Sequence, residues 1–218
     1  MVFGIAPLVL AGMAVAAVFA VAQTSAGPML SFTATTDNIT AANDSVKIDV
    51  LRWSTDAERD QLLSAWTDPP PADAGGRGAG GRGGRGGAAQ APPPPTPEGS
   101  LLNALGKAPT VGYLWSSEVA GYSIHYAVRL PAPDGGERIV FVTDRRLGAS
   151  NDRWKPVSGG ANGYEFSVVE LHLNSKGEGE GKISLTGKVA VDSPAKTIAL
   201  ENYSASPVVL KSVKRRGH

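Results

Sequence analysis

The sequence predicts a mainly β protein, an antiparallel β-sandwich or partly open barrel of about nine strands with a short helical hairpin excursion. Apolar and polar residues alternate with period two along most of the chain after residue 29, as expected of half-buried strands. Segments rich in Gly, Pro and Asp separate these runs at hairpin spacing, which favours antiparallel pairing. The chain contains no cysteine, so the fold must rest on its hydrophobic core without disulfides.

The first half is expected to hold short strands on either side of a helical hairpin. Strands are predicted at residues 32–35, 46–50 and 111–115. A helix is predicted to follow Thr55, because Thr55 and Glu58 have the spacing of a capping box. A second short helix is expected from about Leu101, ending before Pro109.

A low-complexity stretch, residues 68–99, separates these two helices. Its ends are rich in proline and its centre in glycine, so it cannot build a packed core, and a disordered insertion is predicted. Lengthening a surface loop costs little, because closure entropy grows only with the logarithm of its length. Residues 29–67 and 100–216 are therefore expected to form a single β-rich domain.

The second half is expected to consist of three hairpins. The first pairs residues 122–130 with 138–144 through the turn at 133–136, and residues 139–142 are apolar enough to be buried on both faces. The second pairs residues 164–174 with 182–192 through a Gly-rich turn at 175–181. The third pairs residues 197–203 with 208–213. Along residues 122–130, we expect one face to carry Tyr122, Ile124, Tyr126, Val128 and Leu130.

The amino-terminal residues 1–22 indicate export. No Asp, Glu, Lys or Arg precedes Asp37, and the apolar run ends at Ala20-Val21-Ala22, a pattern that signal peptidases cleave. No basic flank follows the run, which favours a cleaved signal peptide over a retained membrane anchor. The body is therefore expected in the periplasm, at the cell surface or outside the cell, with membrane contact only if this segment is retained.

Because basic and acidic residues are nearly balanced, a nucleic acid is not expected as a partner. The chain has 21 basic and 20 acidic residues, a net charge of +1. Three Gly-Arg repeats, at Arg77, Arg82 and Arg85, resemble RNA-binding segments but carry no interleaved aromatic residue. The expected partner is an unidentified protein or a small-molecule ligand.

No motif predicts catalysis, a cofactor or a metal. The run from Gly177 to Lys182 departs from the phosphate-loop spacing and joins two expected strands. Glu170 and His172 share one face of a strand, but a metal site there would also need His125, and nothing in the sequence brings His125 near. Ser123 and His125 also share a face, without an evident third catalytic partner.

The polar segment after residue 142 is the place where a ligand is expected. Arg145, Arg146 and Arg153 offer forked donors for a carboxylate, sulfate or sugar, and Trp154 offers a stacking surface. The alternative is a loop linked by Asp–Arg contacts that covers one edge of the β structure.

Three stretches resemble a group of uncharacterised exported bacterial proteins: residues 48–53, residues 136–139 together with 143–145, and residues 169–173 together with 177–182. The resemblance implies a bacterial origin and export, and brings no activity or site residue.

The function predicted is an exported, non-catalytic β-module that binds a partner or a small ligand. One alternative is an exported hydrolase that uses carboxylates such as Asp144, Asp152 and Glu170. The other is a barrel that holds an apolar ligand in an interior lined by Tyr122, Tyr126, Phe141 and Leu171.

Overall fold

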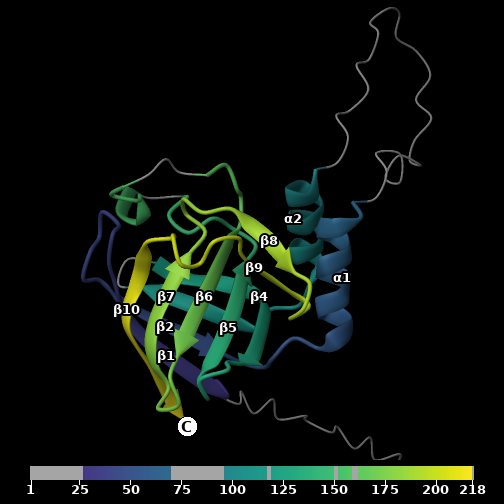
Figure 1. The fold of residues 1–218 in the computed structure, drawn as a ribbon. Helices are drawn as coiled ribbons and strands as arrows, with labels where there is room; N and C mark the ends of the chain where they lie inside the picture. Colours follow the sequence, from purple (N-terminus) through teal and green to yellow (C-terminus); the bar gives the residue numbers. More distant parts are fainter. Residues whose placement is uncertain (1–26, 70–95, 117–118, 150–151, 159–161, 218) are drawn as a thin grey trace, which may run out of the picture.

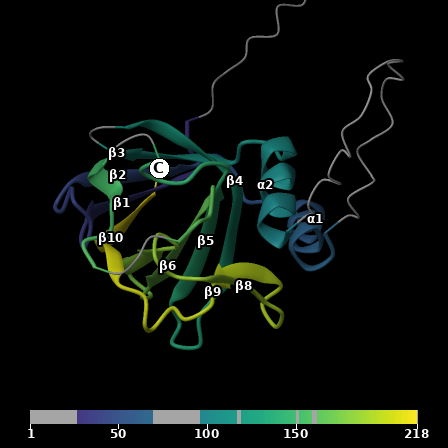
Figure 2. The ribbon, with the colours of Figure 1, turned by 90° about the horizontal axis from the view of Figure 1, so that it is seen from above.

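The computed structural model describes residues 27–69, 96–116, 119–149, 152–158 and 162–217, in which eight antiparallel strands close into a barrel (Figures 1 and 2). The predicted mainly β class is confirmed, and the barrel is closed instead of partly open. Around the barrel the order is β1-β10-β7-β6-β5-β4-β3-β2. The strands are β1 (Leu30–Thr36), β2 (Ser45–Val50), β3 (Gly112–Ser116), β4 (Val119–Pro131), β5 (Glu137–Thr143), β6 (Ser167–Leu173), β7 (Glu178–Ile183) and β10 (Val208–Gly217).

Bulky apolar side chains fill the barrel interior. Phe32 on β1 meets Phe141 on β5 edge to face, with ring centroids 6.0 Å apart, and both are fully buried. An eight-stranded barrel has an interior that side chains alone can fill. Three residues expected to line a ligand cavity, Tyr122, Phe141 and Leu171, belong to this packed cluster.

A second apolar cluster covers the outer face of β4, β5 and β6. It is built from the helices α1 (Asp56–Thr67) and α2 (Pro97–Lys107) and from the hairpin of β8 (Val189–Asp192) and β9 (Thr197–Leu200). We call residues 189–200 the arm; it lies outside the ring of strands, against β5 and β6 and beside α1 (Figures 1 and 2). The predicted burial of residues 139–142 on both faces is confirmed: Ile139 and Phe141 point inward, whereas Val140 and Val142 pack under this cover.

Both helices begin at side-chain caps. Thr55 and Glu58 form the predicted capping box, with reciprocal hydrogen bonds between side chain and backbone. The second helix starts earlier than expected, because Thr96 caps it and Pro97 occupies its first turn, where a missing N–H costs nothing. The two helices pack against each other.

A β-bulge in β4 reverses the face that points into the barrel. Ile124 pairs with Thr143 and Tyr126 pairs with Val142, so His125 is an extra residue on β4. The prediction of one continuous apolar face along residues 122–130 is therefore wrong, because one added residue shifts the period-two pattern by one position. The inward residues are Tyr122, Ile124 and Ala127, and the outward ones include Tyr126 and Val128.

The expected strand at 182–192 covers only the end of β7 and all of β8, which belong to different sheets, and most of the expected turn at 175–181 belongs to β7. β7 ends at Ile183, and the chain then turns and leaves the barrel before β8 begins. The Asn162 amide holds this turn by donating to the carbonyl oxygen of Gly187 at 2.9 Å. Alternation continues across the turn because β7 and β8 are both partly buried, so the period alone could not reveal the break.

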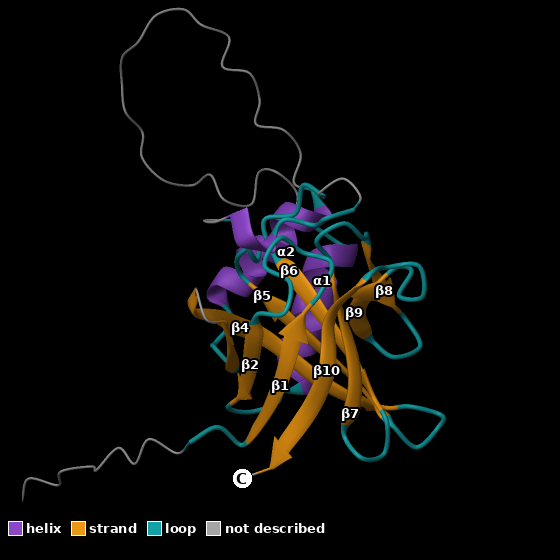
Figure 3. Cartoon of the chain, turned by 90° about the vertical axis from the view of Figure 1, so that its left-hand side faces the viewer, coloured by secondary structure: helices purple, strands orange, loops and turns teal. Residues whose placement is uncertain are grey.

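The expected pairing of residues 197–203 with 208–213 is also wrong. β9 pairs with its neighbour β8 through a tight turn, in which the Lys196 amide donates to the Ser193 carbonyl. β10 pairs instead with β7 on one side and with β1 on the other, and the β1–β10 seam closes the barrel (Figure 3).

Two predicted segments lie largely outside the described residues. These are the signal peptide or anchor at residues 1–22 and residues 70–95 of the predicted insertion. Within the described ranges, no helix has both the length and the apolar character needed to cross a bilayer.

Candidate functional site

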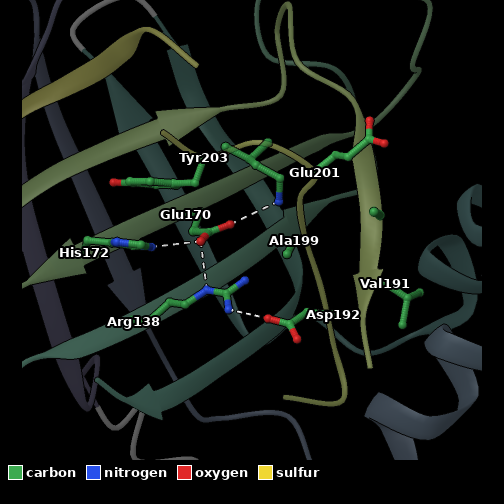
Figure 4. A pocket seen from close by; sticks show the side chains of 10 residues that line it. Arg138, Glu170, His172, Val191, Asp192, Ala199, Glu201 and Tyr203 are labelled. Atoms are coloured by element: carbon green, nitrogen blue, oxygen red, sulfur yellow. Dashed lines mark hydrogen bonds and ion pairs between the residues drawn. The ribbon is translucent and has the colours of Figure 1, made fainter. Parts of the chain in front are cut away.

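Glu170 is a buried carboxylate on the outer face of the barrel, beneath the arm. Its side chain is 2% exposed. One oxygen accepts hydrogen bonds from Arg138 Nε at 2.8 Å and from His172 Nε2 at 2.9 Å, and the other accepts from the Leu200 amide at 3.1 Å. Glu170 therefore joins three strands, β5, β6 and β9 (Figure 4).

Arg138 links Glu170 to a second carboxylate on the arm. Its Nη1 donates to Asp192 Oδ2 at 2.6 Å, and the other oxygen of Asp192 accepts from the Ala195 amide at 3.2 Å. The hydrogen bond from Arg138 lowers the pKa of Asp192, against a weaker opposing effect of burial. This pair ties the end of β8 to the barrel.

Glu170 also remains ionised despite its burial. Burial by itself would raise the pKa of Glu170, but the hydrogen bonds from His172 and the Leu200 amide, together with the charge of Arg138, bring the pKa below its ordinary value. Both carboxylates of the cluster are therefore negatively charged at neutral pH. Neither holds a proton that it could donate to a leaving group.

Ionised Glu170 determines which nitrogen of His172 carries hydrogen. A carboxylate can only accept, so the contact at 2.9 Å places a proton on Nε2. In the neutral ring, Nδ1 then offers a lone pair. The His172 side chain is 43% exposed, so this acceptor lies on a ring that solvent reaches.

Tyr203 lies between His172 and Lys182. Its ring stacks on His172 with centroids 3.7 Å apart and planes within 4°. The Lys182 ammonium lies 4.5 Å from the ring centroid and donates to the Tyr203 carbonyl oxygen at 2.7 Å. Burial, with the nearby charges of Glu180 and Glu170, raises the pKa of the Tyr203 hydroxyl, which therefore stays neutral.

Two pockets meet at Arg138 and His172, and we call the combined depression the arm groove. One pocket, of about 360 Å³, lies against the arm and includes Glu170, Asp192, Glu201 and Tyr203. The other, of about 390 Å³, lies against the β4–β5 turn. Volumes of this size are typical of small-molecule sites.

The four residues predicted to bind a ligand lie elsewhere, after β5. Arg146 and Trp154 line one pocket of about 690 Å³, which includes neither Arg145 nor Arg153. Trp154 is 2% exposed and packs in the barrel interior, so its rings are covered. Arg146 donates to the Asn162 carbonyl at 2.7 Å, Arg145 lies over the Tyr122 ring, and Arg153 is exposed on a short 3-10 turn.

Of the other residues that the sequence singled out as possible metal ligands or catalytic groups, the structure brings some together and separates others. Glu170 and His172 are in contact, as their shared face suggested, but His125 contacts Ala108 and Asp144 instead. Within the ranges that the structure describes, no three His, Cys, Asp or Glu side chains converge, so the combination of Glu170, His172 and His125 does not form. His125 directs one nitrogen to Ala108 and the other toward Asp144, so neither nitrogen serves Ser123 as a general base.

Sequence reasoning missed Arg138, Asp192 and Tyr203 as members of the groove. Arg138 and Glu170 occupy polar positions of alternating strands, which normally face solvent. The arm covers these two positions, and this burial can be seen only in the folded structure. One signal in the sequence could have indicated this cluster. Three consecutive strands carry charges of alternating sign on their polar faces, at Arg138, Glu170 and Lys182.

Comparison of the chain with protein-family models, with curated proteins and with solved structures yields no match in any of the three.

Proposed function

We propose that this protein is an exported, non-catalytic β-barrel module that binds a small polar ligand in the arm groove. The observation that carries the proposal is His172, which Glu170 holds in one tautomer where two pockets meet. A fixed acceptor beside a rigid aromatic ring suits recognition, because the groups need no reordering when a ligand binds. The groove is favoured over the barrel interior, which bulky side chains occupy.

The charges of the groove indicate the class of ligand. One arginine and three carboxylates, Glu170, Asp192 and Glu201, line the pocket beside the arm. Arg138 is already engaged by two of these carboxylates, whereas Glu201 is exposed. A neutral or cationic molecule with N–H or O–H donors therefore fits better than an anion, because it can donate to His172 Nδ1 and Glu201.

The state of the carboxylates favours binding over hydrolysis. A hydrolase with two carboxylates usually holds one of them protonated near neutral pH, through a raised pKa. Here the pKa values of Glu170 and Asp192 are both lowered, and the same arginine pairs with both. The pair therefore lacks the division into acid and base that such a reaction needs.

The proposal can be tested by identifying what the protein retains. The full chain, purified from the compartment to which it is exported, would be examined by native mass spectrometry for a bound small molecule. Thermal-shift screening would then compare small amines, neutral sugars and carboxylic acids with the wild type and with His172→Phe, which keeps a ring beside Tyr203 but removes Nδ1. Lys47→Ala, on β2, is the control.

We expect amines or sugars to raise the melting temperature of the wild type and of Lys47→Ala, but not that of His172→Phe. Stabilisation by carboxylic acids alone would contradict the charge argument. Equal stabilisation of His172→Phe and the wild type would place the ligand outside the arm groove. Turnover of a ligand by the wild type would contradict the non-catalytic assignment.

A further inference from the structure

The β-bulge of β4 positions His125 beside Asp144, away from the arm groove. His125 is the extra residue between the pairs Ile124–Thr143 and Tyr126–Val142, and Asp144 directly follows β5. Bulges occur often beside functional sites, where they redirect a side chain. His125 therefore meets Asp144 at the point where the pairing of β4 with β5 is irregular.

The imidazole of His125 is held in one orientation. Its Nδ1 lies 2.7 Å from the carbonyl oxygen of Ala108, the residue that caps the end of α2. Because a carbonyl can only accept, Nδ1 carries the hydrogen, and Nε2 of the neutral ring offers a lone pair. The side chain is only 11% exposed, so packing also restricts the ring.

When the ring is neutral, Nε2 and the Asp144 carboxylate face each other as two acceptors. Nε2 lies 3.5 Å from Asp144 Oδ2. Among the described residues, neither His125 Nε2 nor Asp144 Oδ1 has a hydrogen-bond partner, although both atoms are buried. Buried polar atoms without a partner are rare and call for an explanation, such as a bound ion.

We propose that His125 Nε2 and the Asp144 carboxylate bind a divalent transition-metal ion of the Zn²⁺ class. At the usual ligand distances of about 2.0–2.1 Å, two donors 3.5 Å apart subtend about 115° at the metal, close to a tetrahedral angle. Histidines that bind metals usually donate their other N–H to a carbonyl or carboxylate, as His125 donates to Ala108. The sequence alone predicted no metal site, because His125 lies on β4 whereas Asp144 follows β5.

The site has two protein ligands, because no third His, Cys, Asp or Glu within the described ranges joins them. Water or an external ligand completes the coordination, so the ion keeps open positions. The positive charge of Arg145 opposes metal binding at this site. Its Nε lies 3.8 Å from Asp144 Oδ1, and its side chain is 63% exposed. The Arg145 side chain competes with the metal for the carboxylate, so its removal should strengthen metal binding.

The experiment measures Zn²⁺ affinity by calorimetry and Co²⁺ coordination by visible absorption on the full chain, after treatment with a chelator. The chain contains three histidines, so single His→Gln variants at positions 125, 172 and 218 assign the ligand. His125→Gln and Asp144→Asn should each weaken Zn²⁺ binding more than about tenfold and remove the Co²⁺ absorption. His172→Gln and His218→Gln should bind as the wild type does, and Arg145→Gln should bind more tightly.

Circular dichroism and thermal melting establish whether each variant folds. If His125→Gln does not fold, the two single variants Asp144→Asn and Arg145→Gln still test the proposal. Unchanged Zn²⁺ affinity in Asp144→Asn would overturn the proposal, as would equal losses in His172→Gln or His218→Gln. If the wild type binds no Zn²⁺ at millimolar concentration, the proposal is also overturned, and the pair is a plain histidine–aspartate contact.

Discussion

Replacing Glu170 by Gln should destabilise the protein more than removing the charge of Asp192, the other carboxylate that Arg138 binds. Glu170 accepts three hydrogen bonds, from Arg138, His172 and the Leu200 amide. Glutamine has one acceptor oxygen and adds an NH₂ group, so at least one of those three donors loses its partner inside the protein. Arg138 also loses the more deeply buried of its two counter-charges.

The expected cost follows from the burial of the pair. Removing one partner of a buried ion pair typically costs about 3–5 kcal/mol, because the other charge is left uncompensated. Arg138 is 21% exposed and keeps Asp192, so we expect about 3 kcal/mol, at the lower end. Asp192→Asn is the matched control: Asp192 is 28% exposed and bonds mainly to the same arginine, so its loss should cost about 1 kcal/mol.

Urea unfolding at pH 7, followed by tryptophan fluorescence, measures both values, since the chain has four tryptophans. Combining Glu170→Gln with Arg138→Met should cost less than the sum of the single changes, because no buried charge is then left unpaired. If Glu170→Gln costs no more than Asp192→Asn, or if the double variant is strictly additive, burial of this ion pair does not control stability.

Three other expectations concern pH, a helix cap and a close backbone contact. The lowered pKa of Glu170 means that its contribution is fully present above its ordinary value of 4.5 and is lost as pH falls through the lower, folded-state pKa. The stability difference between wild type and Glu170→Gln should therefore be smaller at pH 3 than at pH 7 in urea titrations, and an equal difference at both would contradict the assignment. Thr55→Ala should cost about 1 kcal/mol in the same assay by removing the capping box, while an unchanged midpoint would show that the cap adds nothing. Gly179→Ala should cost about 1–3 kcal/mol, because a Cβ there would lie 1.9 Å from the His172 carbonyl oxygen. The control Gly106→Ala, where nothing lies within 4 Å in a helix, should instead stabilise by up to about 1 kcal/mol, and similar effects of the two changes would refute the steric argument.

Local chemistry made several elements predictable from the sequence. The spacing of Thr55 and Glu58 located the first helix, because a capping box depends on nearby residues only. The turn before β5 was equally local, with Gly135 at a positive φ of 79°. Burial of residues 139–142 on both faces followed from an unbroken apolar run.

Long-range pairing and the candidate site could not be predicted in the same way. Alternation shows that residues 208–213 form a strand, but not that its partners are β1 and β7. A one-residue bulge at His125 changes no composition, yet it reverses every later side chain of β4. Glu170 occupies a polar position, and its burial depends on an arm that pairs with nothing in the barrel sheet.

The β1–β10 seam has a consequence for the order of folding. Leu30 pairs with Gly217, so nearly the whole described chain must be synthesised before the barrel can close. The hairpins β4–β5 and β6–β7 have partners close in sequence and can form while the chain is still growing, whereas loop-closure entropy delays the seam. Until β10 arrives, the open edges of β1 and β7 present unpaired backbone groups, so a ribosome-bound or carboxy-terminally truncated chain is the state most exposed to aggregation.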